Sequence, residues 1–152
     1  KEVFSYKFPD IVRSSKLDTT NENYTCKEEF IEDKVNSISI DYNLRISCTV
    51  KGQNGIRDML LQLVPVLYDK KKLVFKIEST TAPEPYNILW KVKNEGQQAR
   101  DVGQLRGSIF PGEKTITEPT KFKGKHYVEC YIVKNNILVA MDRIDVPIEI
   151  ER

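Results

Sequence analysis

Three observations predict a mainly β domain, built as a two-layer β-sandwich with one inserted helix. Residues 38–50 place an apolar or aromatic side chain at every even position, and residues 127–133 form a second strand-like stretch. Such alternation is typical of strands, because successive side chains point to opposite faces of a sheet. Turn residues separate seven or so short segments of this kind, whereas only one stretch, at about residues 55–67, has apolar residues at helical spacing.

The N-terminal part is predicted to be a linker followed by the start of the domain. Residues 1–26 combine a short apolar stretch with a polar run, KLDTTNEN, which favours a connecting segment. The domain itself is expected to span residues 27–152. A short helix is predicted over residues 27–35, because Glu28, Glu29 and Glu32 would place acidic side chains in its first turns.

The inserted helix is predicted from one stripe of apolar residues. Its members follow the i, i+3, i+4, i+7 pattern of a helix face: Ile56, Met59, Leu60, Leu63 and Leu67. Pro65 lacks a backbone N–H donor, so this helix is expected to end or kink near Val64.

The rest of the chain is predicted to be strands and turns. Asn135-Asn136 between two apolar segments favours a hairpin, because Asn tolerates positive φ. Residues 97–104 are a polar connection with room for one helical turn. The expected strands, in chain order, are residues 73–77, 88–92, 106–110, 115–117, 127–133, 138–141 and 144–150.

Composition narrows the functional classes. A chain of 152 residues fits one domain with its own core. A net charge of +2, with both signs interspersed, argues against a dedicated nucleic-acid binder, because it creates no dominant positive field. No apolar run approaches the roughly 18 residues of a membrane span, so we expect a cytoplasmic protein without a membrane partner.

Three cysteines occur, Cys26, Cys48 and Cys130, without CxxC spacing. An odd set of this kind favours reduced, buried thiols in the cytosol over a disulfide framework. An immunoglobulin-type arrangement of Cys48, Trp90 and Cys130 fails, because Trp90 lies too far after the first cysteine.

Trp90 and Arg106 are the first candidates for a binding site. Trp90 shares a strand face with Ile88 and Val92, so it is either a core aromatic or a surface on which a base or sugar stacks. The Arg106 guanidinium offers a fork of donors that suits a carboxylate or phosphate, and Gly107 permits close approach. Its alternative role is a salt bridge to Glu129 or Glu118.

The segment HYVECYIV supplies further candidates. One face of this strand carries His126, Val128, Cys130 and Ile132, and the other carries Tyr127, Glu129, Tyr131 and Val133. Glu129 is either part of a polar binding row or a structural carboxylate paired with Arg106 or Arg143. His126 is the only histidine, and a structural role is the simpler interpretation, because a metal site needs several converging ligands.

Lysines at positions 121, 123 and 125 precede this strand. Alternating lysines protect exposed strands from edge pairing, and phosphate attraction is the other interpretation. No motif for nucleophilic, acid–base or metal catalysis is present, so we expect neither enzymatic activity nor a cofactor.

Four ordered sequence blocks carry a resemblance to a known family. They are residues 90–96 (WKVKNEG), 105–109 (LRGSI), 118–120 (EPT) and 126–133 (HYVECYIV). Together they resemble the C-terminal sensor domain of bacterial second-messenger synthases, the adenylyl/guanylyl cyclase and SMODS C-terminal sensor (AGS-C) domain. Residues 3–9 (VFSYKFP) are similar to the segment that closes the synthase part before the linker.

The resemblance implies a partner and a role. A synthase domain, either a cGAS/DncV-like nucleotidyltransferase or a cyclase, would precede the linker. The domain would bind an infection-linked ligand and control synthesis of a cyclic nucleotide in bacterial antiphage defence, and its sandwich would be immunoglobulin-like. The ligand could be a small molecule, a nucleotide, RNA or a phage product.

Two other functions stay open on the sequence. A standalone nucleotide or nucleic-acid module would use Arg106, the three lysines and Trp90 for phosphate contact and stacking. A protein-interaction domain would instead dock the synthase or a phage protein. For a ligand pocket, we expect Arg106 as the charged contact, with Glu129, Tyr131, His126 and Tyr127 nearby and Trp90 as a wall or floor.

Overall fold

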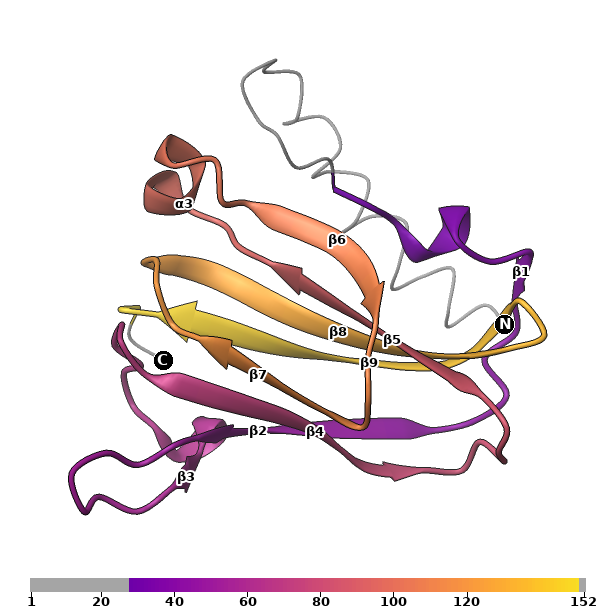
Figure 1. The fold of residues 1–152 in the computed structure, drawn as a ribbon, viewed down its shortest axis with the longest axis horizontal. Helices are drawn as coiled ribbons and strands as arrows, with labels where there is room; N and C mark the ends of the chain where they lie inside the picture. Colours follow the sequence, from indigo (N-terminus) through magenta and orange to yellow (C-terminus); the bar gives the residue numbers. More distant parts are fainter. Residues whose placement is uncertain (1–27, 151–152) are drawn as a thin grey trace.

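A computed structural model of the protein describes residues 28–150, which form two facing β-sheets (Figure 1). The five-stranded sheet contains, in spatial order, β1 (Ser37–Ile38), β9 (Ile137–Ile148), β8 (Gly124–Lys134), β5 (Asn87–Lys93) and β6 (Arg106–Pro111). The four-stranded sheet contains β3 (Met59–Leu60), β2 (Leu44–Val50), β4 (Lys72–Thr80) and β7 (Thr115–Pro119). The predicted mainly β, two-layer architecture is therefore confirmed. The predicted linker and Cys26 lie outside the described residues.

The core lies between the two sheets. Strand β2 alternates buried and less buried positions along its length, as its sequence pattern predicted. Its apolar side chains, with Leu73 and Phe75 of β4, meet Trp90, Val92, Val128, Cys130 and Ile132 of the five-stranded sheet. Cys48 and Cys130 are both buried, and burial raises the pKa of the Cys130 thiol. Both are therefore packing residues.

The long alternating stretch at residues 38–50 serves both sheets. Ile38 pairs with Leu138 in the five-stranded sheet, whereas Leu44 begins the strand that pairs with β4 in the other sheet. Between them, the amides of Asp41 and Tyr42 both donate to the Val139 carbonyl. The chain thus crosses from one sheet to the other while its alternation continues.

The predicted hairpin at Asn135-Asn136 is confirmed. Both residues have positive φ, at 52° and 60°, and they join β8 to β9 in antiparallel register. The two segments predicted at residues 138–141 and 144–150 form the single strand β9.

The predicted helix at residues 55–67 is wrong. The segment instead forms β3, which pairs with the end of β2, and a 3-10 turn, η3 (Leu61–Leu63). Asn54 and Gly55 adopt positive φ and turn the chain, and the Asp58 carboxylate accepts hydrogen bonds from the Gly52 amide and the Lys51 ammonium. Most of the apolar stripe has no surface to cover, because Ile56 and Leu63 remain more than 60% exposed, and Leu67 is the member that joins the core.

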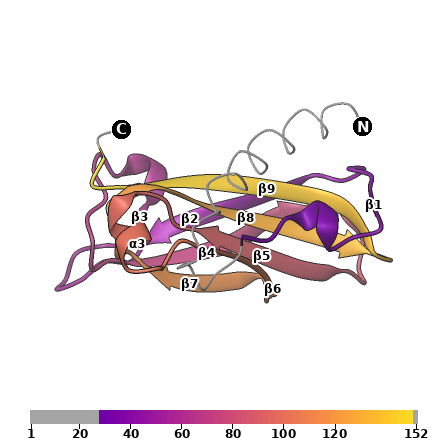
Figure 2. The same cartoon turned by 90° about the horizontal axis from the view of Figure 1, so that it is seen from above.

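The helical content that is present lies elsewhere. The polar connection forms the short helix α3 (Gln97–Asp101), and residues 28–35 contain only the 3-10 turn η2 (Ile31–Asp33) where a short helix was expected. In both views α3 and β3 lie at one end of the long axis and β1 lies at the other (Figure 2).

Candidate functional site

A pocket opens at the α3 end of the sandwich, and we call it the end pocket. Its volume is about 220 Å³. Apolar core residues form its floor, among them Phe75, Val92 and Val128. Its polar lining comprises Asn94, Gln104, Arg106, Glu118, Lys121, His126 and Tyr127. The structure thus brings four of the predicted site residues together: Arg106, Lys121, His126 and Tyr127.

Arg106 reaches the end pocket from a distorted part of β6. Its φ is +55°, the φ of Gly107 is +111°, and the β5–β6 register shifts between Lys91 and Lys93. A non-glycine residue in this left-handed region is strained by about 1 kcal/mol or more, and such residues gather at functional sites. The bulge therefore directs the Arg106 side chain into the end pocket, and the backbone is strained as a result.

The partner of Arg106 is Glu118 of β7, in the opposite sheet. Nη1 donates to Oε2 at 2.7 Å and Nη2 donates to Oε1 at 3.2 Å. This fork geometry leaves the guanidinium with further donors. The side chains are 35% and 17% exposed, so the pair is accessible from the pocket mouth. The sequence left Glu129 and Glu118 open as partners, and the structure selects Glu118.

His126 has a structural set of hydrogen bonds. Its Nδ1 accepts the Glu95 amide at 2.8 Å, so Nε2 carries the proton and donates to the Phe122 carbonyl. Burial lowers the pKa of the imidazole, which favours this neutral form. Gly124 helps to form this contact, because a Cβ there would lie 1.9 Å from the Glu95 carbonyl oxygen. His126 therefore shapes the pocket wall and has no free ring nitrogen.

The other predicted site residues lie elsewhere. Trp90 is fully buried between the sheets, where Nε1 donates to the Glu113 carbonyl at 2.9 Å. Lys123 and Lys125 are exposed and do not line the end pocket. Glu129 and Tyr131 lie on the outer face of the five-stranded sheet, which faces away from the core.

This outer face is covered by the N-terminal segment, residues 28–38. Phe30 and Ile31 pack on Tyr131, Val133 and Leu138. The Glu29 amide donates to the Gly107 carbonyl, and the Glu29 carboxylate accepts the Ile109 amide at 2.7 Å. The segment therefore also protects the outer edge of β6, which is an edge strand.

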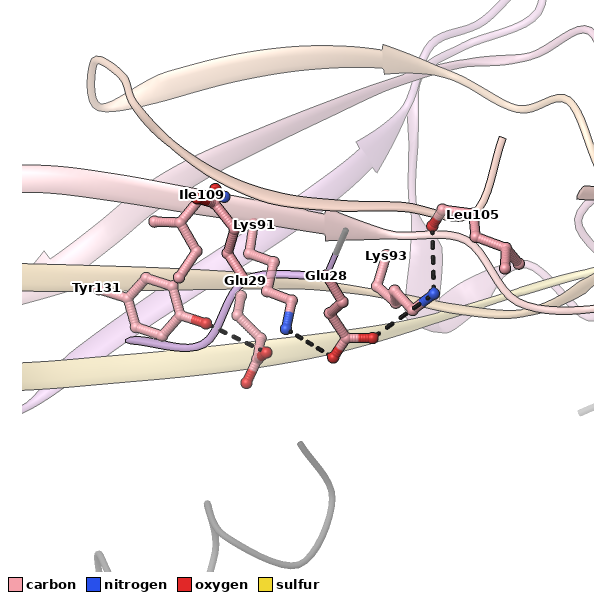
Figure 3. Close-up of polar contacts among 8 residues, drawn as sticks. Glu28, Glu29, Lys91, Lys93, Leu105, Ile109 and Tyr131 are labelled. Carbon is pink, nitrogen blue, oxygen red and sulfur yellow. Dashed lines mark hydrogen bonds and ion pairs between the residues drawn. The ribbon is translucent and has the colours of Figure 1, made fainter. Parts of the chain in front are cut away.

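Beneath the segment lies a buried charge cluster, which we define as Glu28, Lys91, Lys93 and Glu129. The Glu28 carboxylate lies 3.1 Å from Lys91 Nζ and 3.6 Å from Lys93 Nζ (Figure 3). The side chain of Lys91 is fully buried and that of Glu28 is 2% exposed. Burial lowers the pKa of Lys93, and Glu28 opposes this shift. Lys93 also donates to the Leu105 carbonyl at 3.4 Å.

Glu129 completes the buried charge cluster from β8. It is opposite Lys91 in the β5–β8 register and opposite Arg143 in the β8–β9 register. The Tyr131 hydroxyl donates to its Oε1 at 3.2 Å. Burial raises the pKa of Glu129, and the charges of Lys91 and Arg143 oppose this increase. Of the two arginines considered from the sequence, Arg143 lies opposite Glu129 in the sheet register, whereas Arg106 pairs with Glu118.

Tyr127 lies beside the buried charge cluster. Its ring carries the Arg143 guanidinium 3.8 Å from its centroid and Lys91 Nζ at 5.8 Å. Among the described residues, its buried hydroxyl has no hydrogen-bond partner.

Sequence reasoning missed Glu28, Lys91 and Lys93 as site residues. Lysines are seldom buried, so the default interpretation places them in solvent. A signal was nevertheless present: Lys91 and Lys93 alternate with Trp90 and Val92 along a predicted strand, and a second predicted strand carries the polar row of Tyr127, Glu129 and Tyr131.

Two other kinds of feature are a group of metal ligands and a membrane-spanning helix. Within residues 28–150, no group of three or more His, Cys, Asp or Glu side chains converges as metal ligands. In the same part of the chain, no helix has the length and apolar character to cross a membrane.

A family model matches most of the chain. No curated protein matches the chain. The family model described as the adenylyl/guanylyl and SMODS C-terminal sensor domain matches residues 25–149, which covers both sheets, the end pocket and the buried charge cluster. Because this match spans most of the sequence, the chain belongs to the adenylyl/guanylyl and SMODS C-terminal sensor domain family.

Proposed function

We propose that the chain is a non-catalytic regulatory domain that binds an infection-linked ligand in its end pocket. Binding controls an attached cyclic-nucleotide synthase in cytoplasmic bacterial antiphage defence. The observation that carries the proposal is the end pocket itself, because it holds a strained, partly exposed arginine in a member of a sensor family. Protein sites of this kind combine an apolar floor with a few convergent polar groups.

The pocket lining indicates the ligand class. Arg106 and Lys121 are cationic, Glu118 is anionic, and Asn94 and Gln104 offer amide groups. An apolar floor with one surplus positive charge suits a small molecule with an apolar body and an anionic or carbonyl head. The volume of about 220 Å³ is below the usual range for drug-sized ligands, so we propose a small ligand.

The pocket is connected to the N-terminal segment through two adjacent residues. Arg106 points into the end pocket, and Gly107 lies against Glu28, since a Cβ at Gly107 would lie 3.0 Å from Glu28 Cγ. A ligand that competes with Glu118 for the Arg106 guanidinium would shift the bulge that both contacts share. Such a ligand would favour one of two positions of the N-terminal segment, which leads toward the proposed synthase domain.

The test is Arg106→Ala in the full-length synthase. The Arg106–Glu118 pair is partly exposed, so we expect its loss to cost about 1 kcal/mol or less and to change the melting temperature by only a few degrees. Activation by the small-molecule fraction of phage-infected cells should fall at least tenfold. Cyclic-nucleotide synthesis and thermal unfolding are measured on the same preparation.

Lys114→Ala is the matched control, because Lys114 forms an exposed ion pair with Glu84 at 3.4 Å and does not line the end pocket. This variant should keep normal activation. Normal activation of Arg106→Ala in a folded protein would contradict the proposed site. Activation only by a macromolecular fraction of the extract would favour a protein or RNA cue instead of a small molecule.

A further inference from the structure

A second feature of the outer face goes beyond the end pocket: the buried charge cluster holds a carboxylate that belongs to the segment covering it. Glu28 reaches two lysines of β5, Lys91 and Lys93, from outside the sheet. The five-stranded sheet therefore supplies cations on its outer face, and the covering segment supplies an anion.

The fit of Glu28 to these cations is incomplete. One oxygen, Oε2, receives a hydrogen bond from Lys91 at 3.1 Å. The other oxygen, Oε1, lies 3.6 Å from Lys93 Nζ and, as far as residues 28–150 are concerned, is buried without a hydrogen bond. The Tyr127 hydroxyl is a third polar group of this region, directly across the sheet from Lys93, and it is also unbonded among residues 28–150. Within the described residues, the Glu28 carboxylate thus leaves the Tyr127 hydroxyl unbonded, and its own second oxygen lies just beyond hydrogen-bond distance of Lys93.

We propose that Lys91, Lys93 and the Tyr127 hydroxyl form an oxyanion-binding site, that Glu28 occupies it in this conformation, and that an external oxyanion taking the place of Glu28 releases the N-terminal segment. The ligand class is a carboxylate or a phosphate group. A tetrahedral phosphate presents more acceptor oxygens than a carboxylate, so it can engage both ammonium groups and the hydroxyl together. The source is either free phosphate or the phosphate group of a nucleotide.

The arrangement makes release feasible. If Glu28 leaves while the segment stays docked, two ammonium groups lose their partner in a buried place, which is strongly unfavourable, whereas lifting of the segment lets water hydrate them. An oxyanion that enters restores the charge balance while the segment is displaced. Phosphate and Glu28 therefore compete for the same site. Each lowers the apparent affinity of the site for the other by the same factor.

The first experiment is anion rescue of Glu28→Ala in the 152-residue chain. Melting temperatures are measured in sodium phosphate, in sodium acetate and in sodium chloride of equal ionic strength. A phosphate site with a Kd of about 10 mM should raise the melting temperature by about 3–6 °C at 100 mM, because stabilisation grows with the logarithm of 1 + [L]/Kd. Comparing the melting temperature in adenosine monophosphate with that in adenosine distinguishes a nucleotide source from free phosphate.

Glu84→Ala is the matched control, since Glu84 is 70% exposed in its pair with Lys114. It reports the general effect of each salt, and the gain for Glu28→Ala must exceed it. Equal gains in the two variants would overturn the site. If Glu28→Ala does not fold, Glu28→Gln keeps the shape of the side chain and serves the same comparison.

The second experiment tests displacement in the wild-type chain. Hydrogen exchange is followed at the amides of Glu29, Asp33 and Lys34, which bond within the segment or to Gly107. Phosphate should accelerate exchange at these amides severalfold and leave the β8 amides unchanged. Unchanged exchange at the segment, under conditions in which phosphate stabilises Glu28→Ala, would overturn the displacement.

Discussion

The two faces of the central strands β5 and β8 are both buried, yet they are built from different chemistry. Toward the second sheet, these strands present Trp90, Val92, Val128, Cys130 and Ile132, all at most 6% exposed. Toward the N-terminal segment, they present Lys91, Lys93, Tyr127, Glu129 and Tyr131, which are as deeply buried. One pair of strands therefore separates an apolar core from a charged one.

The difference concerns what holds each face closed. Apolar burial stabilises without a specific partner, because it depends on the area removed from water. The charged face is closed only while each buried charge keeps its partner, because an unpaired charge is costly to bury and inexpensive to hydrate. The inner face should therefore define the global stability, and the outer face should be able to open locally.

The largest expected effect is on the inner face. Trp90→Ala removes a fully buried ring and leaves the Glu113 carbonyl without its indole donor. We expect a loss of about 3–5 kcal/mol in the free energy of unfolding. Urea denaturation followed by circular dichroism measures it. A loss below about 1 kcal/mol would show that this face does not dominate stability.

A smaller effect is expected on the outer face. Glu28→Ala strands Lys91 and Lys93, but the N-terminal segment can lift and hydrate them, so the loss is limited to the free energy of docking the segment. We expect about 1–3 kcal/mol, below the 3–5 kcal/mol of a buried pair that cannot open. The control Glu84→Ala should stay within about 0.5 kcal/mol. A loss for Glu28→Ala as large as that for Trp90→Ala would contradict local opening.

The smallest expected effect is a pH dependence from Glu129. Burial raises its pKa, so the folded state binds this proton more tightly than the unfolded state does. Stability contributed by this group is therefore lost as pH rises from the ordinary carboxyl pKa toward the raised value. Glu129→Gln should remove this loss, so its stability relative to wild type should increase as the pH rises above about 4.5, the ordinary pKa of this carboxyl group. A relative stability that is flat or falls with pH would contradict the shift.

The sequence predicted the inner face better than the outer face for the same physical reason. Period-two alternation in β2 and β8 marks strands, because apolar side chains must share a buried side. The helix predicted at residues 55–67 failed because local turn bonds at Asp58 and the Asn54-Gly55 turn determine that segment. Most of the stripe also lacks a packing partner, since Ile56 and Leu63 stay exposed. Periodicity alone does not report whether a surface exists to receive it.

The candidate site was predictable only where one residue carries a distinctive geometry. Arg106-Gly107 was singled out from the sequence, and the structure places Arg106 in the end pocket with His126 and Lys121. The charged face depends on contacts between Glu28 and β5 that are 63 residues apart in sequence. Lysine side chains are usually exposed, so the sequence predicts that Lys91 and Lys93 face solvent. Only the tertiary structure reveals that both are buried.

Native-state hydrogen exchange on the wild-type chain and on Glu28→Ala tests the central claim most directly. In the wild type, the Glu29, Asp33 and Lys34 amides should open with a lower free energy than the amides of β5 and β8. In Glu28→Ala, exchange at the N-terminal segment and at the Ile109 amide should accelerate further, while β5 and β8 keep their protection. If all these amides instead lose protection together and by the same amount, the two faces form one cooperative unit, and the distinction drawn between them is wrong.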